Sequence, residues 1–292
     1  MHTLVGLGYI IMKRGRPSRT AHLVTLARAI ADTGLSHVPN FSDPTARVFL
    51  NEKGKKTLEK TQRIAREGKR SMYLEAARGM ADNLALRTTA IDRAVREAVA
   101  IGARQLVILG AGYDGRAWRM PELAGVKVFE VDHPSTQADK RSHVPELPRP
   151  IGEVSFVPID FEHESIDKVL DRAGHDPSVA TCWIWEGVVM YLTHDAMRAT
   201  LAGIAGRSAS GLTLIVNYHT VRRGLIGQLI FRLIGEPQIS HWTPDEMAAD
   251  LATVGMRVVD DSGMVDWNNQ FAQGKARVAE RSAYMRIAVA RM

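Results

Sequence analysis

The sequence contains a single cysteine, Cys182, in a chain of 292 residues. One cysteine excludes an intrachain disulfide and fits a reducing, cytoplasmic compartment. Cys182 lies in an apolar, strand-like run, which predicts a buried and inert thiol rather than a nucleophile. Zinc-ligand spacing of cysteine and histidine is also lacking, so no metal site is expected.

Membrane signals are missing as well. No run of about 18 apolar residues occurs, so no membrane-spanning helix is expected. The N-terminus has an apolar stretch, but its positive charges follow that stretch, whereas a secretory signal has the reverse order. We interpret residues 1–19 as a mobile or packed leader.

The sequence has no recognisable RNA-binding module and no basic strand interleaved with aromatic residues. It nevertheless has 38 Lys and Arg against 32 Asp and Glu, a net charge of +6, and the excess lies in the first hundred residues. A basic N-terminal third can meet nucleic acid, anionic lipid or an anionic substrate. A solvated helical face is the simpler interpretation, and we expect no nucleic-acid partner.

The rest of the chain is organised around residues 106–132. This stretch opens with a run typical of a buried strand, breaks at a glycine turn over residues 110–112, and resumes in a second apolar run that ends in Glu130-Val131-Asp132. A buried strand, a glycine turn and an acid closing the next strand predict a nucleotide-type cofactor site at the carboxyl edge of a parallel sheet. Alternation puts Glu130 and Asp132 on one face. We favour Asp132, the later acid, as the ligand of the ribose hydroxyls.

The identity of the cofactor depends on the length of the segment after the turn. Residues 110–115 match the dinucleotide fingerprint GxGxxG, with an acid about 20 residues on. That fingerprint needs a full helix, whose N-terminus holds a pyrophosphate. Pro121 leaves room for only about a turn and a half of helix, which is too short for the usual crossover. We therefore favour a ligand with a ribose but no pyrophosphate, such as S-adenosylmethionine. An NAD(P)-dependent oxidoreductase is the alternative in the same fold class.

The order and spacing of three segments resemble those of motifs in a known protein family: GAGYDGRAWRM, FEVDHPSTQADKR and EGVVMYLT. They resemble motifs of the leucine carboxyl methyltransferase-like family, whose members are class I S-adenosylmethionine-dependent O-methyltransferases. The resemblance covers about residues 87–193 and, more loosely, the chain to its C-terminus. It implies an α/β, Rossmann-like sheet of seven strands with helices on both faces. Gly115 departs from the family pattern, which usually has Thr there.

The resemblance also implies roles for single residues. Arg87 lies in an RTxxxD-like segment and would supply a guanidinium to the cofactor's carboxylate; a surface arginine in a helical salt bridge is the alternative. Asp160 and Phe161 would hold the adenine, although Asp160 could instead cap the next helix. Glu186 is predicted from its position instead: it follows the fourth strand, and ligands of a doubly wound sheet lie beyond strand carboxyl ends, so it is placed to meet the cofactor's ammonium or sulfonium. The predicted cofactor-binding residues are Arg87, Gly110, Ala111, Gly112, Asp114, Glu130, Asp132, Asp160, Phe161 and Glu186.

Hydrophobic periodicity predicts the remaining elements. Helices are expected over residues 20–33, 45–51, 71–101, 135–141, 194–206 and 243–254, with a capping box, Thr243 to Glu246, opening the last. Residues 53–70 are either an exposed helix or a loose linker. Strands are expected over residues 106–109, 126–132, 154–159, 180–185, 212–218, 256–260 and 282–291.

Two domains are predicted from this pattern: a helical N-terminal extension or cap, residues 1–100, and a methyltransferase domain, residues 101–292. An insert over residues 221–240 has one apolar helical stripe. We interpret it as a lid over an apolar substrate; a homodimer face or a membrane-surface helix is the alternative.

The predicted activity is S-adenosylmethionine-dependent O-methylation of a small molecule, by resemblance a secondary-metabolite carboxylate or acidic hydroxyl. A carboxylate is already ionised near neutral pH and needs no general base. A hydroxyl needs one, for which His219 and then His241 are the candidates, and Tyr191 can line the substrate side. A non-catalytic protein whose basic N-terminal third binds nucleic acid is the alternative from another class.

Overall fold

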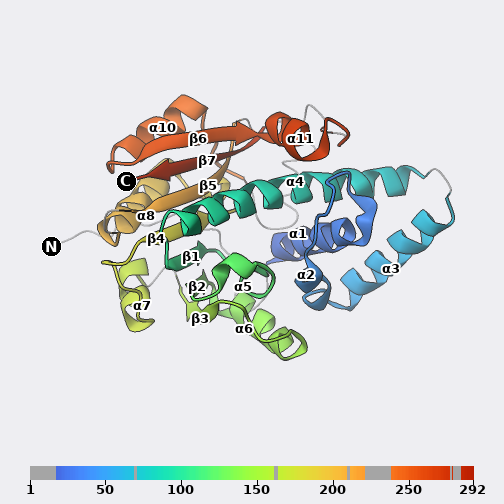
Figure 1. Cartoon of the computed structure of the whole chain (residues 1–292), viewed down its shortest axis with the longest axis horizontal. Coiled ribbons are helices and arrows are strands. Elements are labelled where there is room, and N and C mark those ends of the chain that lie inside the picture. Colours follow the sequence, from blue (N-terminus) through green and yellow to red (C-terminus); the bar gives the residue numbers. More distant parts are fainter. Residues whose placement is uncertain are drawn as a thin grey trace.

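The computed structural model describes residues 18–68, 71–160, 164–208, 211–220, 238–276, 278 and 284–292. Its centre is a seven-stranded sheet in the order β3-β2-β1-β4-β5-β7-β6 (Figure 1). The strands are β1 (Gln105–Leu109), β2 (Lys127–Asp132), β3 (Glu153–Pro158), β4 (Thr181–Trp185), β5 (Thr213–His219), β6 (Arg257–Gly263) and β7 (Met285–Arg291). Strands β1 to β5 pair in parallel, and β7 is antiparallel to both β5 and β6. Because the chain builds β2 and β3 on one side of β1 and then places β4 on the other, a topological switch point lies at the carboxyl ends of β1 and β4.

Helices cover both faces of the sheet and extend beyond one end of it (Figure 1). The α-helices are α1 (Arg19–Ile30), α2 (Pro44–Val48), α3 (Glu52–Arg66), α4 (Met72–Ala100), α5 (Arg116–Arg119), α6 (Pro134–His143), α7 (Ile166–Arg172), α8 (His194–Gly206), α10 (Pro244–Ala252) and α11 (Met264–Ala272). A π-helical turn, η1 (Ala31–Leu35), continues α1, and short 3₁₀ turns lie at η2 (Pro121–Leu123), η3 (Val144–Glu146) and η4 (Val189–Tyr191). None of the helices in the described part of the chain is long and apolar enough to cross a bilayer.

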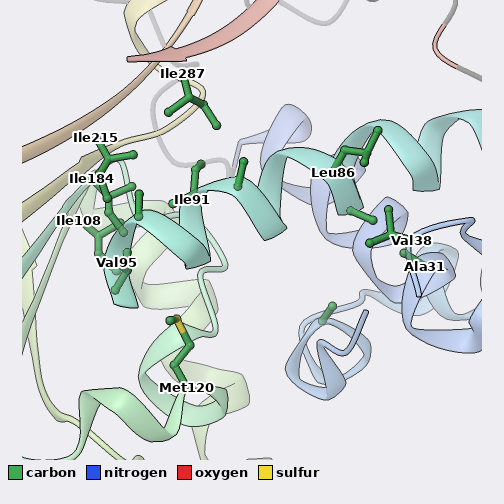
Figure 2. Packing of buried hydrophobic residues seen from close by; sticks show 14 of the residues in the cluster. Ala31, Val38, Leu86, Ile91, Val95, Ile108, Met120, Ile184, Ile215 and Ile287 are labelled. Atoms are coloured by element: carbon green, nitrogen blue, oxygen red, sulfur yellow. The ribbon is translucent and has the colours of Figure 1, made fainter. Parts of the chain in front are cut away.

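The long helix α4 joins the sheet to the N-terminal helices. Near its C-terminal end, Ile91 and Val95 pack with Ile108 and other strand side chains on one face of the sheet (Figure 2). Further toward its N-terminus, Leu86 packs with residues of the α1–α2 region, including Val38 (Figure 2). The opposite face forms a second apolar layer, which includes Val107 of β1 and side chains of α7, α8 and α10. Burying each such aliphatic side chain contributes about 1.5–3 kcal/mol.

The predicted fold class is confirmed, and each predicted strand has an observed counterpart. The capping box of α10 is also present, because Glu246 and Thr243 each bond to the other's backbone amide. Residues 53–70, for which a helix and a linker were both open, contain the helix α3, which begins after the N-cap Asn51. Residues 221–237 of the predicted lid lie outside the described residues, and the division of the chain at residue 100 stays a prediction.

Candidate functional site

The glycine turn begins where β1 ends, at the switch point. Gly110 has φ +67° and Gly112 has φ +50°, a region that favours glycine. A Cβ on Gly110 would also lie 2.6 Å from Cγ2 of Val188, which follows β4. The backbone amides of Gly110 and Ala111 both donate to the carbonyl of Val131 on β2, at 2.8 and 3.1 Å. The turn is therefore closed tightly against the ends of both neighbouring strands.

Asp132 ends β2 directly beside this turn. Its carboxylate accepts hydrogen bonds from the backbone amide of Gly112 and, at 2.6 Å, from that of His133. Burial raises the pKa of Asp132, while the two amides act in the opposite direction. Two amide donors leave part of the acceptor capacity of a carboxylate unused, which suits a ligand carrying hydroxyl groups.

Glu130, the other acid on this face of β2, has a different environment. It is buried, and its Oε2 lies 2.5 Å from Nζ of Lys140 on α6. Lys140 also donates to the carbonyl of Asp114, at 2.6 Å. Burial raises the pKa of Glu130 to about 7, against the lowering effect of Lys140. Glu130 therefore ties α6 to the glycine turn, and its predicted role as a cofactor ligand remains a prediction.

Glu186, directly after β4, lies between two arginines. Its Oε1 is 2.7 Å from Nη2 of Arg87 on α4, and its Oε2 is 3.0 Å from Nη1 of Arg116 on α5. Burial alone would raise the pKa of Glu186, but Arg87 and Arg116 lower it to about 2. Glu186 is therefore a carboxylate throughout the neutral pH range, and the sheet edge presents charges of both signs.

These residues belong to a larger buried network. Arg116 pairs with Asp92 at 2.8 Å and with Asp114, while Arg119 contacts the same Asp92 at 2.5 and 3.0 Å. Burial alone would raise the pKa of Asp92, but Arg119 and Arg116 lower it to about 2. The network alternates four arginines and four carboxylates: Arg28, Arg87, Arg116, Arg119, Asp43, Asp92, Asp114 and Glu186.

The sequence did not predict most of this network. Asp92, Arg116 and Arg119 nevertheless stand in the quoted RTxxxD-like and GAGYDGRAWRM segments, so these motifs are the signal that could have found them. Asp114 was predicted to touch the cofactor, but its carboxylate also accepts the backbone amide of Arg116 at 2.7 Å. In this structure it therefore holds Arg116 in place beside Glu186.

Asp160 follows β3 at the same edge of the sheet. Its backbone amide lies 3.4 Å from Oε2 of Glu164, and its carbonyl accepts the amide of Glu164 at 2.8 Å. Helix α7 begins after Ser165 as its N-cap, so the alternative in which Asp160 caps this helix is wrong. Phe161, its predicted partner in holding adenine, lies outside the described residues.

The three residues predicted on the acceptor side differ in exposure. His219, the last residue of β5, is buried, with Nδ1 3.3 Å from Oε1 of Gln238. Its ring lies edge-on to Tyr284, with 4.6 Å between the centroids. Tyr191 is buried in η4, whereas His241 is exposed. The structure therefore places His219 in a packed environment at a strand end and His241 in solvent.

The sequence profile of the family described as "Leucine carboxyl methyltransferase" matches residues 21–205. A Frankia alni protein is 36% identical over 208 residues, which cover 70% of this chain and 70% of that protein. A Streptomyces coelicolor protein is 34% identical over 189 residues, covering 62% of this chain and 66% of that protein. Both are named "Putative S-adenosyl-L-methionine-dependent methyltransferase".

Solved structures share the fold at low sequence identity. A DUF574 family protein from Streptomyces avermitilis aligns with a TM-score of 0.59 and 14% identity, covering 94% of this chain and 97% of that one. A Thermobifida fusca protein aligns with a TM-score of 0.55 and 13% identity, covering 96% of each chain. The predicted family, fold and cofactor class agree with these comparisons and are confirmed. That family's profile matches more than half of this chain, which also has the strand order and the glycine turn described above. The chain belongs to the leucine carboxyl methyltransferase family.

Proposed function

We propose that this protein transfers the methyl group of S-adenosylmethionine to an oxygen atom of a small molecule. In this proposal the adenosine half of the cofactor lies at the glycine turn, with its ribose hydroxyls on Asp132. The amino-acid half lies between Arg87 and Glu186. The observation that carries the proposal is that Asp132, Arg87 and Glu186 all lie at the switch point where β1 and β4 end, although they come from three distant segments.

The charges of the site fit the methionine part of the cofactor. Arg87 can pair with its α-carboxylate and Glu186 with its α-ammonium, so the incoming zwitterion matches an ion pair that is already neutral. Nε of Arg87 and Nη2 of Arg116 are buried without a hydrogen-bond partner in the described part of the chain. Buried donors of this kind favour a ligand with acceptor oxygens.

The turn itself argues against a dinucleotide. Helix α5 has only four residues, and the 3₁₀ turn η2 comes directly after it at Pro121. A pyrophosphate site uses the N-terminus of a full helix after the third glycine. This geometry supports S-adenosylmethionine over NAD(P), the alternative with the same fold class.

Bound S-adenosylmethionine would supply an electrophilic methyl group on a sulfonium. The protein then has to orient cofactor and acceptor for in-line displacement and exclude water, which can lower the barrier by about 7–11 kcal/mol. Glu186 favours the cationic cofactor through its negative charge. By the family resemblance the acceptor is a carboxylate or an acidic hydroxyl, and for a hydroxyl His219 is the proposed base.

The proposal is tested by calorimetric titration of the protein with S-adenosylhomocysteine and with NAD. We expect S-adenosylhomocysteine to bind and NAD not to bind. Asp132→Ala should weaken the binding of S-adenosylhomocysteine by about 1–3 kcal/mol through loss of the hydroxyl acceptor. Asp176→Ala, at an exposed acid beyond the amino end of β1, is the control and should bind as the wild type does. Binding of NAD in place of S-adenosylhomocysteine would contradict the proposal. Transfer of labelled methyl to carboxylates and phenols, but not to amines, tests the oxygen acceptor.

A further inference from the structure

We propose that helices α1 and α2 hold the glycine turn in its ligand-binding shape, with Arg28 and Thr45 as positioning residues. The inference rests on the proposed function, because it assumes that the turn binds the cofactor. It assigns to the N-terminal helices a part of the cofactor site itself, in addition to any role as a cover for the substrate.

Hydrogen bonds to β2 hold residues 110–112 of the turn, but the segment after them has little helix of its own for support. In a dinucleotide site a full helix comes after the glycines and fixes their conformation, but here α5 spans only Arg116–Arg119. The two glycines at 110 and 112 adopt positive φ, and glycine has the widest conformational freedom of any residue. A turn of this composition needs contacts from elsewhere to keep one shape.

Helix α1 approaches the turn at three points. Nη2 of the buried Arg28 donates to the carbonyl oxygen of Tyr113 at 2.6 Å, and a Cβ on Gly112 would lie 3.4 Å from Cβ of Ala21. His22 adds a third, with Nε2 3.1 Å from the hydroxyl of Tyr113, which also bonds to Asp139 on α6. The backbone carbonyl of residue 113 is therefore bonded to α1, and residue 112 lies close to the same helix.

Helix α2 supplies the contact at the far end of the turn. Thr45 packs directly against Gly115, so closely that a Cβ on Gly115 would overlap its Oγ1 and lie 2.8 Å from its Cβ. Asp43, the buried N-cap of α2, accepts the hydroxyl of Thr45 at 2.5 Å and pairs with Arg28 at 3.1 Å. One carboxylate thus links the positioning residue on α1 to the positioning residue on α2.

The contacts of Arg28 and Thr45 end on main-chain atoms of the turn, which explains why these two residues bear on binding. The carbonyl of Tyr113 belongs to the peptide group between residues 113 and 114, and the Cα of Gly115 ends the segment, so their positions affect where the amides of the turn point. A contact that favours the binding-competent shape strengthens ligand binding, and by linkage the ligand strengthens the contact to the same extent. Removing Arg28 or Thr45 should therefore weaken cofactor binding and also lower the stability of the fold.

The test measures S-adenosylhomocysteine affinity and amide hydrogen exchange of the turn in the same full-length variants. Arg28→Ala and Thr45→Ala should each raise the dissociation constant by about tenfold or more and speed exchange in the peptide over residues 108–116. Thr45→Ser keeps the hydroxyl and should restore most of both properties. The control is Asp82→Asn, because Asp82 is a buried acid of α4 whose carboxylate bonds to Ser36 and His37, between η1 and α2.

The outcomes separate the inference from the proposed function. Asp82→Asn should lower the melting temperature without changing affinity or exchange in the turn. Arg28→Ala and Thr45→Ala could behave in the same way, with a lower melting temperature but wild-type affinity and exchange. The two residues would then be structural only, and the inference would be overturned. If the wild-type protein does not bind S-adenosylhomocysteine, the proposed function is contradicted. Faster exchange in the turn of the two variants would still show that α1 and α2 hold the turn in place.

Discussion

Arg87 and Glu186 form a buried ion pair, with 2.7 Å between Nη2 and Oε1. Arg87 lies on α4, and Glu186 comes directly after β4, so the pair spans the layer between a helix and the sheet. Arg116 contacts the second oxygen of Glu186 at 3.0 Å. The arrangement holds a cation and an anion side by side at the switch point. The carboxylate of a bound amino acid could face the cation while its ammonium faces the anion.

The first prediction concerns this pair. Arg87→Lys should weaken the binding of S-adenosylhomocysteine by about tenfold or more, because one ammonium cannot reproduce the planar fork of a guanidinium. Glu186→Gln should weaken binding to a similar extent, because it removes the proposed partner of the α-ammonium. Calorimetry gives both affinities.

A matched ligand separates this effect from general damage to the site. 5′-Methylthioadenosine lacks the amino-acid part, so both variants should bind it as the wild type does. Equal losses for the two ligands would show that Arg87 and Glu186 support the site without recognising the zwitterion. Wild-type binding of S-adenosylhomocysteine by Arg87→Lys would favour a purely structural salt bridge.

The second prediction concerns stability against pH. The pKa of Glu130 is raised by burial to about 7 in the folded protein, whereas an unfolded glutamate has a pKa of about 4.3. The folded state therefore holds more protons between these two values, and the unfolding free energy should fall as the pH rises through that window. Relative to Glu130→Gln, the wild type should lose up to about 3 kcal/mol between pH 4 and pH 8.

Urea unfolding at several pH values measures this difference. Glu59→Gln changes an exposed acid on α3 and should leave the pH dependence of the wild type in place. Parallel curves for wild type and Glu130→Gln would mean that Lys140 keeps Glu130 ionised over the whole range.

The third prediction concerns Gly115. Its φ of −115° is open to any residue, so the cost of Gly115→Ala is steric and comes from the overlap with Thr45. We expect a loss of about 1–3 kcal/mol in the unfolding free energy, the usual cost of overpacking. Thr45→Ala should recover part of this loss in the double variant, giving a coupling that a double-mutant cycle detects.

Gly79 is the control for this experiment. It lies inside α4 with open space where a Cβ would go, so Gly79→Ala should stabilise the protein by about 0.5–1 kcal/mol. Additive effects of Gly115→Ala and Thr45→Ala would contradict the close packing of α2 on the turn.

The fourth prediction concerns the two histidines. For a phenol, enol or alcohol acceptor, His219→Ala should lower turnover by about a hundredfold or more through loss of the base. His241→Ala should have little effect, because His241 is exposed while His219 is packed at the end of β5. The pH–rate profiles of both variants and of the wild type are the measurement.

A carboxylate acceptor gives the opposite expectation. It is ionised near neutral pH without help, so His219→Ala should then change KM and leave kcat close to that of the wild type. A hydroxyl acceptor turned over at the full rate by His219→Ala between pH 6 and pH 9 would exclude His219 as the base.

The sequence alone was enough to predict the sheet, the glycine turn and the family. These features depend on residues close together in the chain: the apolar run of β1, the glycines at 110 and 112, and the short gap before Pro121. That gap predicted only about a turn and a half of helix, where the four-residue α5 lies. Local periodicity and motif spacing report such features, because the neighbours that decide them are adjacent in sequence.

Only the tertiary structure decided which of the acids on β2 lies at the glycine turn. Alternation placed Glu130 and Asp132 on the same face, and the sequence contains no local signal that Lys140 of α6 pairs with the first while the amide of Gly112 bonds to the second. The contact between Thr45 and Gly115 is of the same kind. Ion pairs and close packing join segments that are far apart in the chain, so their partners are set by how the helices dock on the sheet, a relation that local periodicity does not contain.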